Sequence, residues 1–339
     1  MSTLYLTFRT RSVHLDNGAL VVTTEDEQQN RQDTRILLRN ISRVVVSGSP
    51  NITIPALKTL CKEKIPLALV SSRGHWFGEV SGIVSNNAER RIAQYRHYLR
   101  GEASCLRFSR PLIASKIGNQ RYILRRLSNR HACTDECAAS LKQLALLREM
   151  LLGANTLSHV RGIEGFAAAE YFEAIARFFP QELPFVERSR RPPKNGANAL
   201  LSFSYTIVGS EVEFAIRLHG LDPAISFLHS IEPGRASLAL DLLEPLRPSI
   251  DAFVLSLLNR KIFTEKDFRF SPEDFGTYLT EESHGKFFEH YEKAMTRRFM
   301  FSPTGTHLNI RSVIEWQICR YLQSLADEKC VPEFFRIPQ

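Results

Sequence analysis

The sequence is poor in the features that mark secreted and membrane proteins. Its six cysteines, among 339 residues, form neither a CxxC pair nor a regular framework, which is typical of a reducing compartment. The first residues lack the apolar run of a signal peptide, and no stretch reaches the ~18 uncharged apolar residues of a membrane helix. We therefore expect a cytoplasmic protein with no membrane partner.

Internal repeats and low-complexity tracts are also absent. With 43% hydrophobic and 24% charged residues, the composition is that of an ordinary globular protein. At ~150 residues per domain, the length suggests about two domains. Lysine and arginine exceed aspartate and glutamate by 44 to 36, a net charge of +8, which does not by itself identify a nucleic-acid partner.

The basic residues are unevenly placed. Residues 90–130 contain eleven arginines and lysines against a single acidic residue, Glu102, and a second cluster lies in a proline-rich stretch at 188–194. Each cluster could be a solvated helix face or loop. Because arginine forks match phosphate oxygens, two arginine-rich clusters favour a phosphate-binding surface. The candidate phosphate-binding residues are Arg121, Arg125, Arg126, Arg188, Arg190, Arg191 and Lys194 in these clusters, with Arg235 outside them.

The order of predicted elements indicates an α+β protein. Residues 1–85 alternate short apolar runs with turns, including a hairpin signal at Asn17-Gly18, and contain one helical pattern at 55–61. From residue 90 onward, apolar residues recur at helical intervals. We predict a small N-terminal β-domain at 1–85 and a larger, all-helical C-terminal domain at 90–339.

Two polar residues interrupt apolar segments of the predicted helical domain. Glu164 lies beside an apolar helical stripe among small residues, so its carboxylate needs a partner if it is buried. An ion pair with Arg161, three residues earlier, is one explanation and a metal ion is another. His229 follows Phe227-Leu228 just before a turn, where a histidine can be a core or capping residue or a ligand.

A third acidic site follows at Asp241 and Glu244. These carboxylates are three residues apart, so they share one face if the segment is helical. Two carboxylates buried together require a cation between them, or one of them must be protonated. Pro245 disfavours helical geometry at Glu244, so the helix is expected to end or kink there.

Glutamate, histidine and Asp-x-x-Glu together supply mainly hard oxygen donors and one imidazole. This mix suits Mg²⁺ or Mn²⁺ and lacks the cysteine or paired histidines of a typical zinc site. Beside a basic surface, such an ion indicates metal-assisted chemistry on a phosphodiester.

The sequence resembles the CRISPR-associated spacer-acquisition integrase, the family-one CRISPR-associated protein. Five segments carry the resemblance by their order and spacing, and residues 117–121 add a weaker likeness. The five segments are 161–172, 198–205, 220–223, 227–229 and 234–244. The sequence departs from the family pattern at Ser226, where glycine is commoner, and at Pro245-Leu246, where a more polar pair is expected.

The resemblance implies an N-terminal β-domain that dimerises and a helical domain that holds a metal. The implied metal ligands are Glu164, His229 and Glu244, with Asp241 as a further acidic residue beside the ion. The implied activity is metal-dependent endonuclease and integrase chemistry on double-stranded DNA. In it, a 3′-hydroxyl of a captured fragment attacks a phosphodiester at the repeat boundary. A small partner, the family-two CRISPR-associated protein, is implied as well.

Two other functions are compatible with the same residues. A DNA-binding scaffold without catalysis would use the carboxylates only in structural ion pairs. A metal-dependent hydrolase of small phosphate esters would need the carboxylates but not the basic segments. Tyr171 and Tyr205 lie in segments that carry the resemblance, and each could contact a DNA end or pack in the core.

Overall fold

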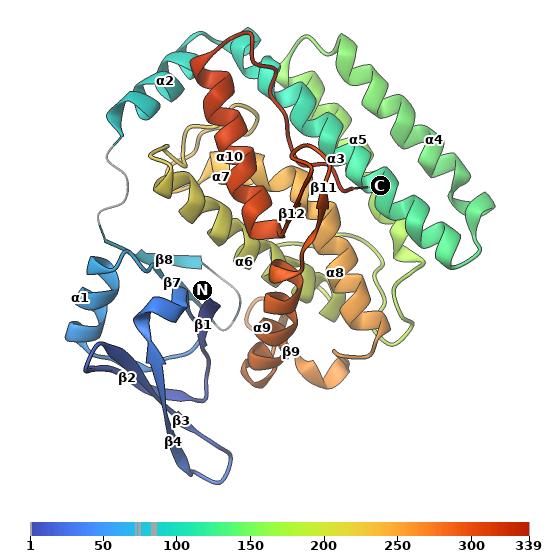
Figure 1. Ribbon diagram of the computed structural model, residues 1–339. Coiled ribbons are helices and arrows are strands. Elements are labelled where there is room, and N and C mark those ends of the chain that lie inside the picture. Colours follow the sequence, from blue (N-terminus) through green and yellow to red (C-terminus); the bar gives the residue numbers. More distant parts are fainter. Residues whose placement is uncertain (1, 72, 74–75, 83–86, 339) are drawn as a thin grey trace.

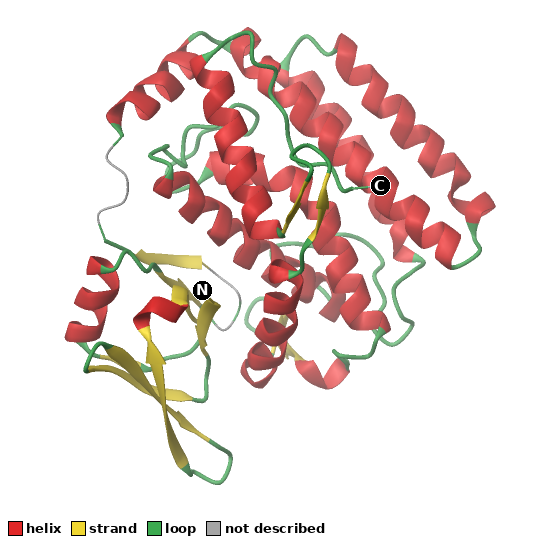
Figure 2. Ribbon diagram, viewed as in Figure 1, coloured by secondary structure: helices red, strands yellow, loops and turns green. Residues whose placement is uncertain are grey.

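The computed structural model describes residues 2–71, 73, 76–82 and 87–338. A small β-rich region forms one end of the molecule, and a larger helical region forms the rest (Figures 1 and 2). The mixed α and β composition and the order of strands before helices agree with the prediction. Residues 83–86, where the predicted β-domain ends, lie outside the described residues, so the domain boundaries at 85 and 90 stay a prediction.

Two four-stranded sheets form the β-rich region. One has the order β1-β5-β7-β8, with parallel pairs except for the antiparallel β7 and β8, and the other has the order β4-β3-β2-β6. The strands are β1 (Ser2–Leu6), β2 (Thr10–Asp16), β3 (Ala19–Glu25), β4 (Arg31–Leu37), β5 (Ile41–Val46), β6 (Asn51–Ile52), β7 (Leu67–Val70) and β8 (Trp76–Val80). Helix α1 (Ile54–Lys62) covers the predicted helix at 55–61.

The hairpin signal at Asn17-Gly18 is confirmed. Both residues have positive φ, 42° and 75°, which the tight turn between β2 and β3 requires and which asparagine and glycine tolerate best. Leu20 and Val22 of β3 and Val13 of β2 then point into the apolar core of this region.

Helices make up most of the remaining chain. They are α2 (Ala88–Leu99), α3 (Glu102–Arg130), α4 (Thr134–Met150), α5 (Leu157–Ala176), α6 (Gly196–Leu218), α7 (Ser237–Leu243), α8 (Arg247–Asn259), α9 (Glu281–Thr296) and α10 (Ile310–Ala326). Their apolar faces form one continuous core. Helices α3, α4 and α5 pack against one another, and α3 also packs on the segment that follows α7.

The prediction of an all-helical C-terminal domain is wrong in two places. Strands β9 (Phe268–Ser271) and β10 (Gly276–Leu279) form one hairpin, and β11 (Phe299–Phe301) and β12 (Thr306–Leu308) form another. Each hairpin closes on a residue with positive φ, Phe275 at 55° or Gly305 at 65°, which a helix cannot accommodate. Their strands are too short to show a period in the sequence.

Helix α6 is long and apolar enough to cross a membrane by length and composition alone. However, 67% of its apolar window is buried inside the molecule. It packs against α7, α8 and α10 at the centre of the helical region. Its apolar character is therefore explained by its place in the core.

The β-rich region is joined to the helical region by polar and aromatic contacts. The Tyr5 ring of β1 stacks on Phe288 of α9 with centroids 4.3 Å apart, and its hydroxyl donates to Glu292 at 2.8 Å. Arg43 of β5 is buried and donates to Ser210 of α6 at 2.9 Å. The sheet that contains β1 and β5 thus contacts α6 and α9 of the helical region.

Candidate active site

Four elements bring the predicted acidic and imidazole residues together. Glu164 lies on α5, His229 lies in the loop between α6 and α7, and Asp241 lies near the end of α7. Glu244 begins η3 (Glu244–Leu246), a short 3₁₀ turn between α7 and α8.

Helix α7 ends just before Glu244, where the sequence predicted an end or a kink. The sequence attributed this end to a non-helical conformation at Glu244, but Glu244 keeps helical dihedrals, with φ −54° and ψ −45°. Pro245 has no backbone N–H, so it cannot donate to the carbonyl four residues earlier and continue the α-helical pattern. The chain instead tightens into η3, and this turn places the Glu244 carboxylate at the site.

The two glutamates converge on one lysine. Nζ of Lys116, on α3, donates to Oε2 of Glu244 at 2.6 Å and also to Oε1 of Glu164. On its other side, Oε1 of Glu244 accepts from Nε of Arg247 at 2.8 Å. Lys116 and Glu244 are buried, whereas 26% of the Glu164 side chain is exposed. The carboxylates of Glu164 and Glu244 thus share one cation, the Lys116 ammonium.

Electrostatics favours the ionised forms of Glu244 and Lys116. Burial would raise the pKa of Glu244, but Arg247, Lys116 and His229 outweigh it and hold that pKa well below its usual value. Burial would likewise lower the pKa of Lys116, but the carboxylates of Glu244 and Glu164 raise it above its usual value. Lys116 thus lies between the carboxylates of Glu164 and Glu244. We call these three residues, together with Arg247, the ion cluster.

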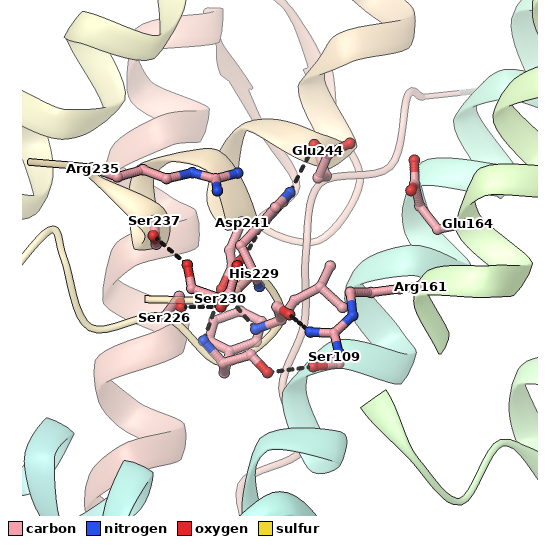
Figure 3. Close-up of polar contacts among 12 residues, drawn as sticks. Ser109, Arg161, Glu164, Ser226, His229, Ser230, Arg235, Ser237, Asp241 and Glu244 are labelled. Atoms are coloured by element: carbon pink, nitrogen blue, oxygen red, sulfur yellow. Dashed lines mark hydrogen bonds and ion pairs between the residues drawn. The ribbon is translucent and has the colours of Figure 1, made fainter. Parts of the chain in front are cut away.

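His229 is oriented by Asp241. Its Nδ1 lies 2.6 Å from Oδ1 of Asp241, and its Nε2 lies 4.0 Å from Oε1 of Glu244 (Figure 3). Asp241 is fully buried and also accepts from the backbone N–H groups of Phe227, Leu228 and His229 at 2.8 to 3.1 Å. Both oxygens of Asp241 are therefore engaged, and its role is to hold the imidazole with Nε2 toward Glu244.

The loop around His229 is fastened to α3 and α5. Ser109 Oγ donates to the carbonyl of Phe227 at 2.8 Å, and Arg161 donates to the carbonyl of Leu228 at 3.0 Å (Figure 3). Among the described residues Arg161 makes no ion pair with Glu164, whose partner is Lys116. Glu164 thus forms its ion pair with Lys116 and not with Arg161, the partner that the sequence suggested.

These residues suit a hard divalent cation chemically. Across the described part of the chain, no group of three or more His, Cys, Asp or Glu side chains is arranged as a ready-made metal site. The place between Glu164 and Glu244 holds the Lys116 ammonium, a positive group. Carboxylate oxygens from both glutamates and Nε2 of His229 are the donor types that Mg²⁺ and Mn²⁺ accept. The donor set fits such an ion, provided that Lys116 gives way.

Sequence reasoning missed Lys116 and Arg247 as members of this site. Lys116 was counted only among the basic residues of 90–130. It lies beside Ile113 and Ile117 on the apolar face of α3, and a lysine there needs an acidic partner. That placement is the signal that could have identified it.

The candidate DNA-binding arginines have different surroundings. Arg125, Arg126, Arg190, Arg191 and Lys194 are at least partly exposed, and Arg121 is half-buried. Arg235 pairs with Glu232 at 2.6 Å.

Arg188 faces inward instead. It donates to Asn198 at 2.8 Å and to Ser202 at 3.1 Å, and it lies over the Tyr205 ring. The two tyrosines also belong to the interior: Tyr171 is fully buried, and the Tyr205 hydroxyl donates to the buried Asp251. Arg188 thus supports the fold around Tyr205 rather than offering a free guanidinium.

Comparisons with known proteins agree with this layout. Residues 4–293 match the family described as CRISPR associated protein Cas1. The chain is 32% identical over 296 residues to CRISPR-associated endonuclease Cas1 1 of Thermodesulfovibrio yellowstonii, covering 86% of this chain and 91% of the relative. The family resemblance drawn from the sequence is confirmed.

Solved structures share the fold as well. A casposase bound to integration product is similar with a TM-score of 0.86 and 22% identity, over 100% of this chain and 96% of the casposase. A Cas6-RT-Cas1–Cas2 complex is similar with a TM-score of 0.81 and 23% identity, over 100% of this chain and 36% of that chain. With the family match over most of its length, the chain belongs to the Cas1 family of CRISPR-associated proteins.

Proposed function

We propose that this protein is a metal-dependent DNA endonuclease and integrase that inserts short DNA fragments into a CRISPR array. The observation that carries the proposal is that Glu164 and Glu244 converge on one cation, the Lys116 ammonium. Nε2 of His229 faces the carboxylate of Glu244. Family membership and a neighbour described as a casposase bound to integration product support it.

In this proposal Glu164, His229 and Glu244 hold a Mg²⁺ or Mn²⁺ ion. The bound ion would stabilise negative charge on the phosphate and on the leaving oxygen. In the reaction, the 3′-hydroxyl oxygen of the fragment loses its proton and forms a bond to phosphorus, while the bond to the leaving 3′-oxygen breaks and that oxygen takes up a proton to become a new 3′-hydroxyl. One phosphodiester replaces another, so no nucleotide cofactor is needed.

Asp241 acts on the site through His229. By accepting the Nδ1 proton it fixes the tautomer in which the Nε2 lone pair is free to bind a cation. Its three backbone N–H bonds hold the carboxylate in place, so the imidazole is set before any ligand arrives. Asp241 is therefore a positioning residue in this proposal and not itself a ligand.

The proposed partners are double-stranded DNA, a second copy of the chain and the small family-two protein. Exposed arginines on α3 and the basic residues at 190–194 would bind DNA phosphates without reading sequence. A neighbour described as a Cas6-RT-Cas1–Cas2 complex supports the small partner. A cytoplasmic location completes the proposal, supported by six free cysteines.

Strand transfer on supercoiled, repeat-bearing DNA tests the function. We expect Glu164→Ala and His229→Ala to abolish transfer in Mg²⁺ or Mn²⁺ while DNA affinity stays close to that of the wild type. Glu173→Ala, which removes an exposed carboxylate from the same helix as Glu164, serves as the control. Near wild-type transfer by either alanine variant would show that the site is misassigned.

Metal affinity separates catalysis from a scaffold role. A non-catalytic DNA-binding protein should bind Mn²⁺ no better than a generic acidic surface, and Glu164→Ala should leave that affinity unchanged. An integrase should bind Mn²⁺ specifically and lose that binding in the variant. Removal of the exposed arginines distinguishes a hydrolase of small phosphate esters, whose activity would not depend on them.

A further inference from the structure

A second set of arginines lies on the face of α3 opposite to the ion cluster. Gly118, Arg121, Tyr122 and Arg125 recur at intervals of three and four residues, so they share one face of the helix. Lys116 precedes Arg125 by nine residues, which at about 100° per residue places it on the opposite face. The two faces of α3 therefore meet different surroundings.

This arginine face lines a pocket of about 130 Å³. Its walls include Arg121 and Arg125 from α3, Arg148 from α4 and Arg336 from the segment after α10. A neighbouring pocket of about 290 Å³ shares Arg125 and adds Arg126. None of the described residues that line either pocket is acidic. We call the first of these the arginine pocket.

The positive charge in the arginine pocket is not neutralised by the protein. Within the described ranges, no ion pair joins Arg121, Arg125, Arg148 or Arg336 to a carboxylate. Arg247 and Arg311, by contrast, each pair with glutamates at 2.8 to 2.9 Å. Burial and the charges of Arg336 and Arg121 lower the pKa of Arg148. The four guanidinium groups of the arginine pocket thus surround a space large enough for an anion.

The backbone that carries Arg336 is fixed on both sides. Asn119 accepts from the N–H of Ile337 at 2.8 Å and donates to the carbonyl of Phe335 at 3.0 Å. Gln317 accepts from the N–H of Phe335 at 2.9 Å. Asn119 also donates to the carbonyl of Pro245 at 2.7 Å, so the same side chain ties the pocket to η3, which carries Glu244.

The chemistry of the arginine pocket selects a phosphate group. Several guanidinium forks around one space match the tetrahedral oxygens of phosphate, and the lack of carboxylates among the described lining residues disfavours cations. A volume of 130 Å³ corresponds to about four water molecules, which is enough for one phosphate group.

We propose that the arginine pocket binds a backbone phosphate of DNA at a point remote from the reacting phosphodiester. The helix geometry separates Lys116 from Arg125 by about 14 Å along α3 as well as by its two faces. A phosphate held in the arginine pocket therefore differs from the phosphodiester at the carboxylates, because the two sites lie on opposite faces of α3. The assignment of DNA rests on the proposed function, whereas the assignment of phosphate rests on the pocket alone.

The experiment uses the full chain with Arg148→Gln and Arg336→Gln combined. Fluorescence anisotropy with a short labelled duplex is recorded over a range of salt concentrations. We expect about a tenfold weaker affinity and a salt slope smaller by about 0.9 for each phosphate that the variant no longer neutralises. Mn²⁺ affinity should stay at the wild-type value, because the ion cluster lies on the other face of α3. Arg260→Gln, at an exposed position after α8, is the control with a single charge removed.

A thermal shift with inorganic phosphate, against chloride at equal ionic strength, forms the second arm. Stabilisation of the wild type that disappears in the double variant supports a phosphate site, even if the wild type fails to bind DNA and the proposed function falls. Absence of any phosphate shift together with unchanged duplex binding overturns the proposal. A phosphate shift with unchanged duplex affinity and slope overturns the assignment to DNA.

Discussion

Nζ of Lys116 lies 2.6 Å from Oε2 of Glu244 and also donates to Glu164, so one buried ammonium joins two acids from different helical segments. The lysine occupies the position between the carboxylates where the proposed function requires a divalent cation. In that proposal Lys116 stabilises the arrangement of the site in the absence of the metal, and it would have to move for a metal ion to bind.

Replacing Lys116 by methionine should make stability depend strongly on metal. Removal of one partner from a buried ion cluster costs about 3–5 kcal/mol, because the remaining charges lose their compensation. We expect that decrease in the free energy of unfolding with chelator present, and substantial recovery with Mn²⁺. Urea unfolding in both conditions measures it. Lys142→Met, on the surface of α4, should show neither effect. An equal decrease with and without Mn²⁺ would contradict a shared cation position.

Asp241→Asn should weaken metal binding without removing a ligand. The amide cannot accept the Nδ1 proton and all three backbone N–H groups as the carboxylate does. Removal of such an orienting partner typically lowers metal affinity 10–100-fold. Calorimetry with Mn²⁺ measures the affinity, and the NMR chemical shifts of the His229 ring report its tautomer. Wild-type affinity with an altered tautomer would mean that the imidazole does not bind the metal.

Neutralising Arg121, Arg125 and Arg126 together should weaken DNA binding and reduce its salt dependence. Each phosphate that is no longer neutralised lowers the slope of log affinity against log salt by about 0.9. Arg188→Gln offers a contrast, because its hydrogen bonds to Asn198 and Ser202 assign it to the fold. We expect that variant to be less stable to heat and to keep the wild-type slope. An unchanged slope of log affinity against log salt in the triple variant would mean that Arg121, Arg125 and Arg126 do not bind DNA phosphates.

Asp251→Asn should change how stability depends on pH. Burial raises the pKa of Asp251 from 3.8 to about 6, so between these values the folded chain holds a proton that the unfolded chain releases. Acidification through this window therefore favours the folded wild type, by on the order of 3 kcal/mol from this group. The variant lacks this gain.

Urea unfolding of both proteins near neutral pH and below the window tests this prediction. The free energy of unfolding of Asp251→Asn minus that of the wild type should become more negative as the pH falls. Glu244 acts in the opposite sense, because its lowered pKa makes its contribution disappear on acidification, but it does so in both proteins and cancels in the difference. A difference independent of pH would mean that Asp251 ionises normally in the folded state.

Local sequence determined the parts of this protein that depend on near neighbours. Asn17-Gly18 specified a turn because those two residues tolerate positive φ, and Pro245 ended α7 because proline has no N–H to continue the helical hydrogen bonds. The family pattern also identified Glu164, His229 and Glu244 as candidate ligands. The structure brings these three residues to one place; that they bind metal stays a prediction.

Tertiary structure alone decided which charges meet. Lys116 is 48 residues from Glu164 and 128 from Glu244, so only the packing of α3 against α5 and η3 makes it their partner. The same packing turned Arg188 inward and assembled the arginine pocket from α3, α4 and the last segment. Secondary-structure propensity and residue spacing depend on a few neighbouring residues. Ion pairs and pockets depend instead on which segments, distant in sequence, pack against each other and bury their surfaces.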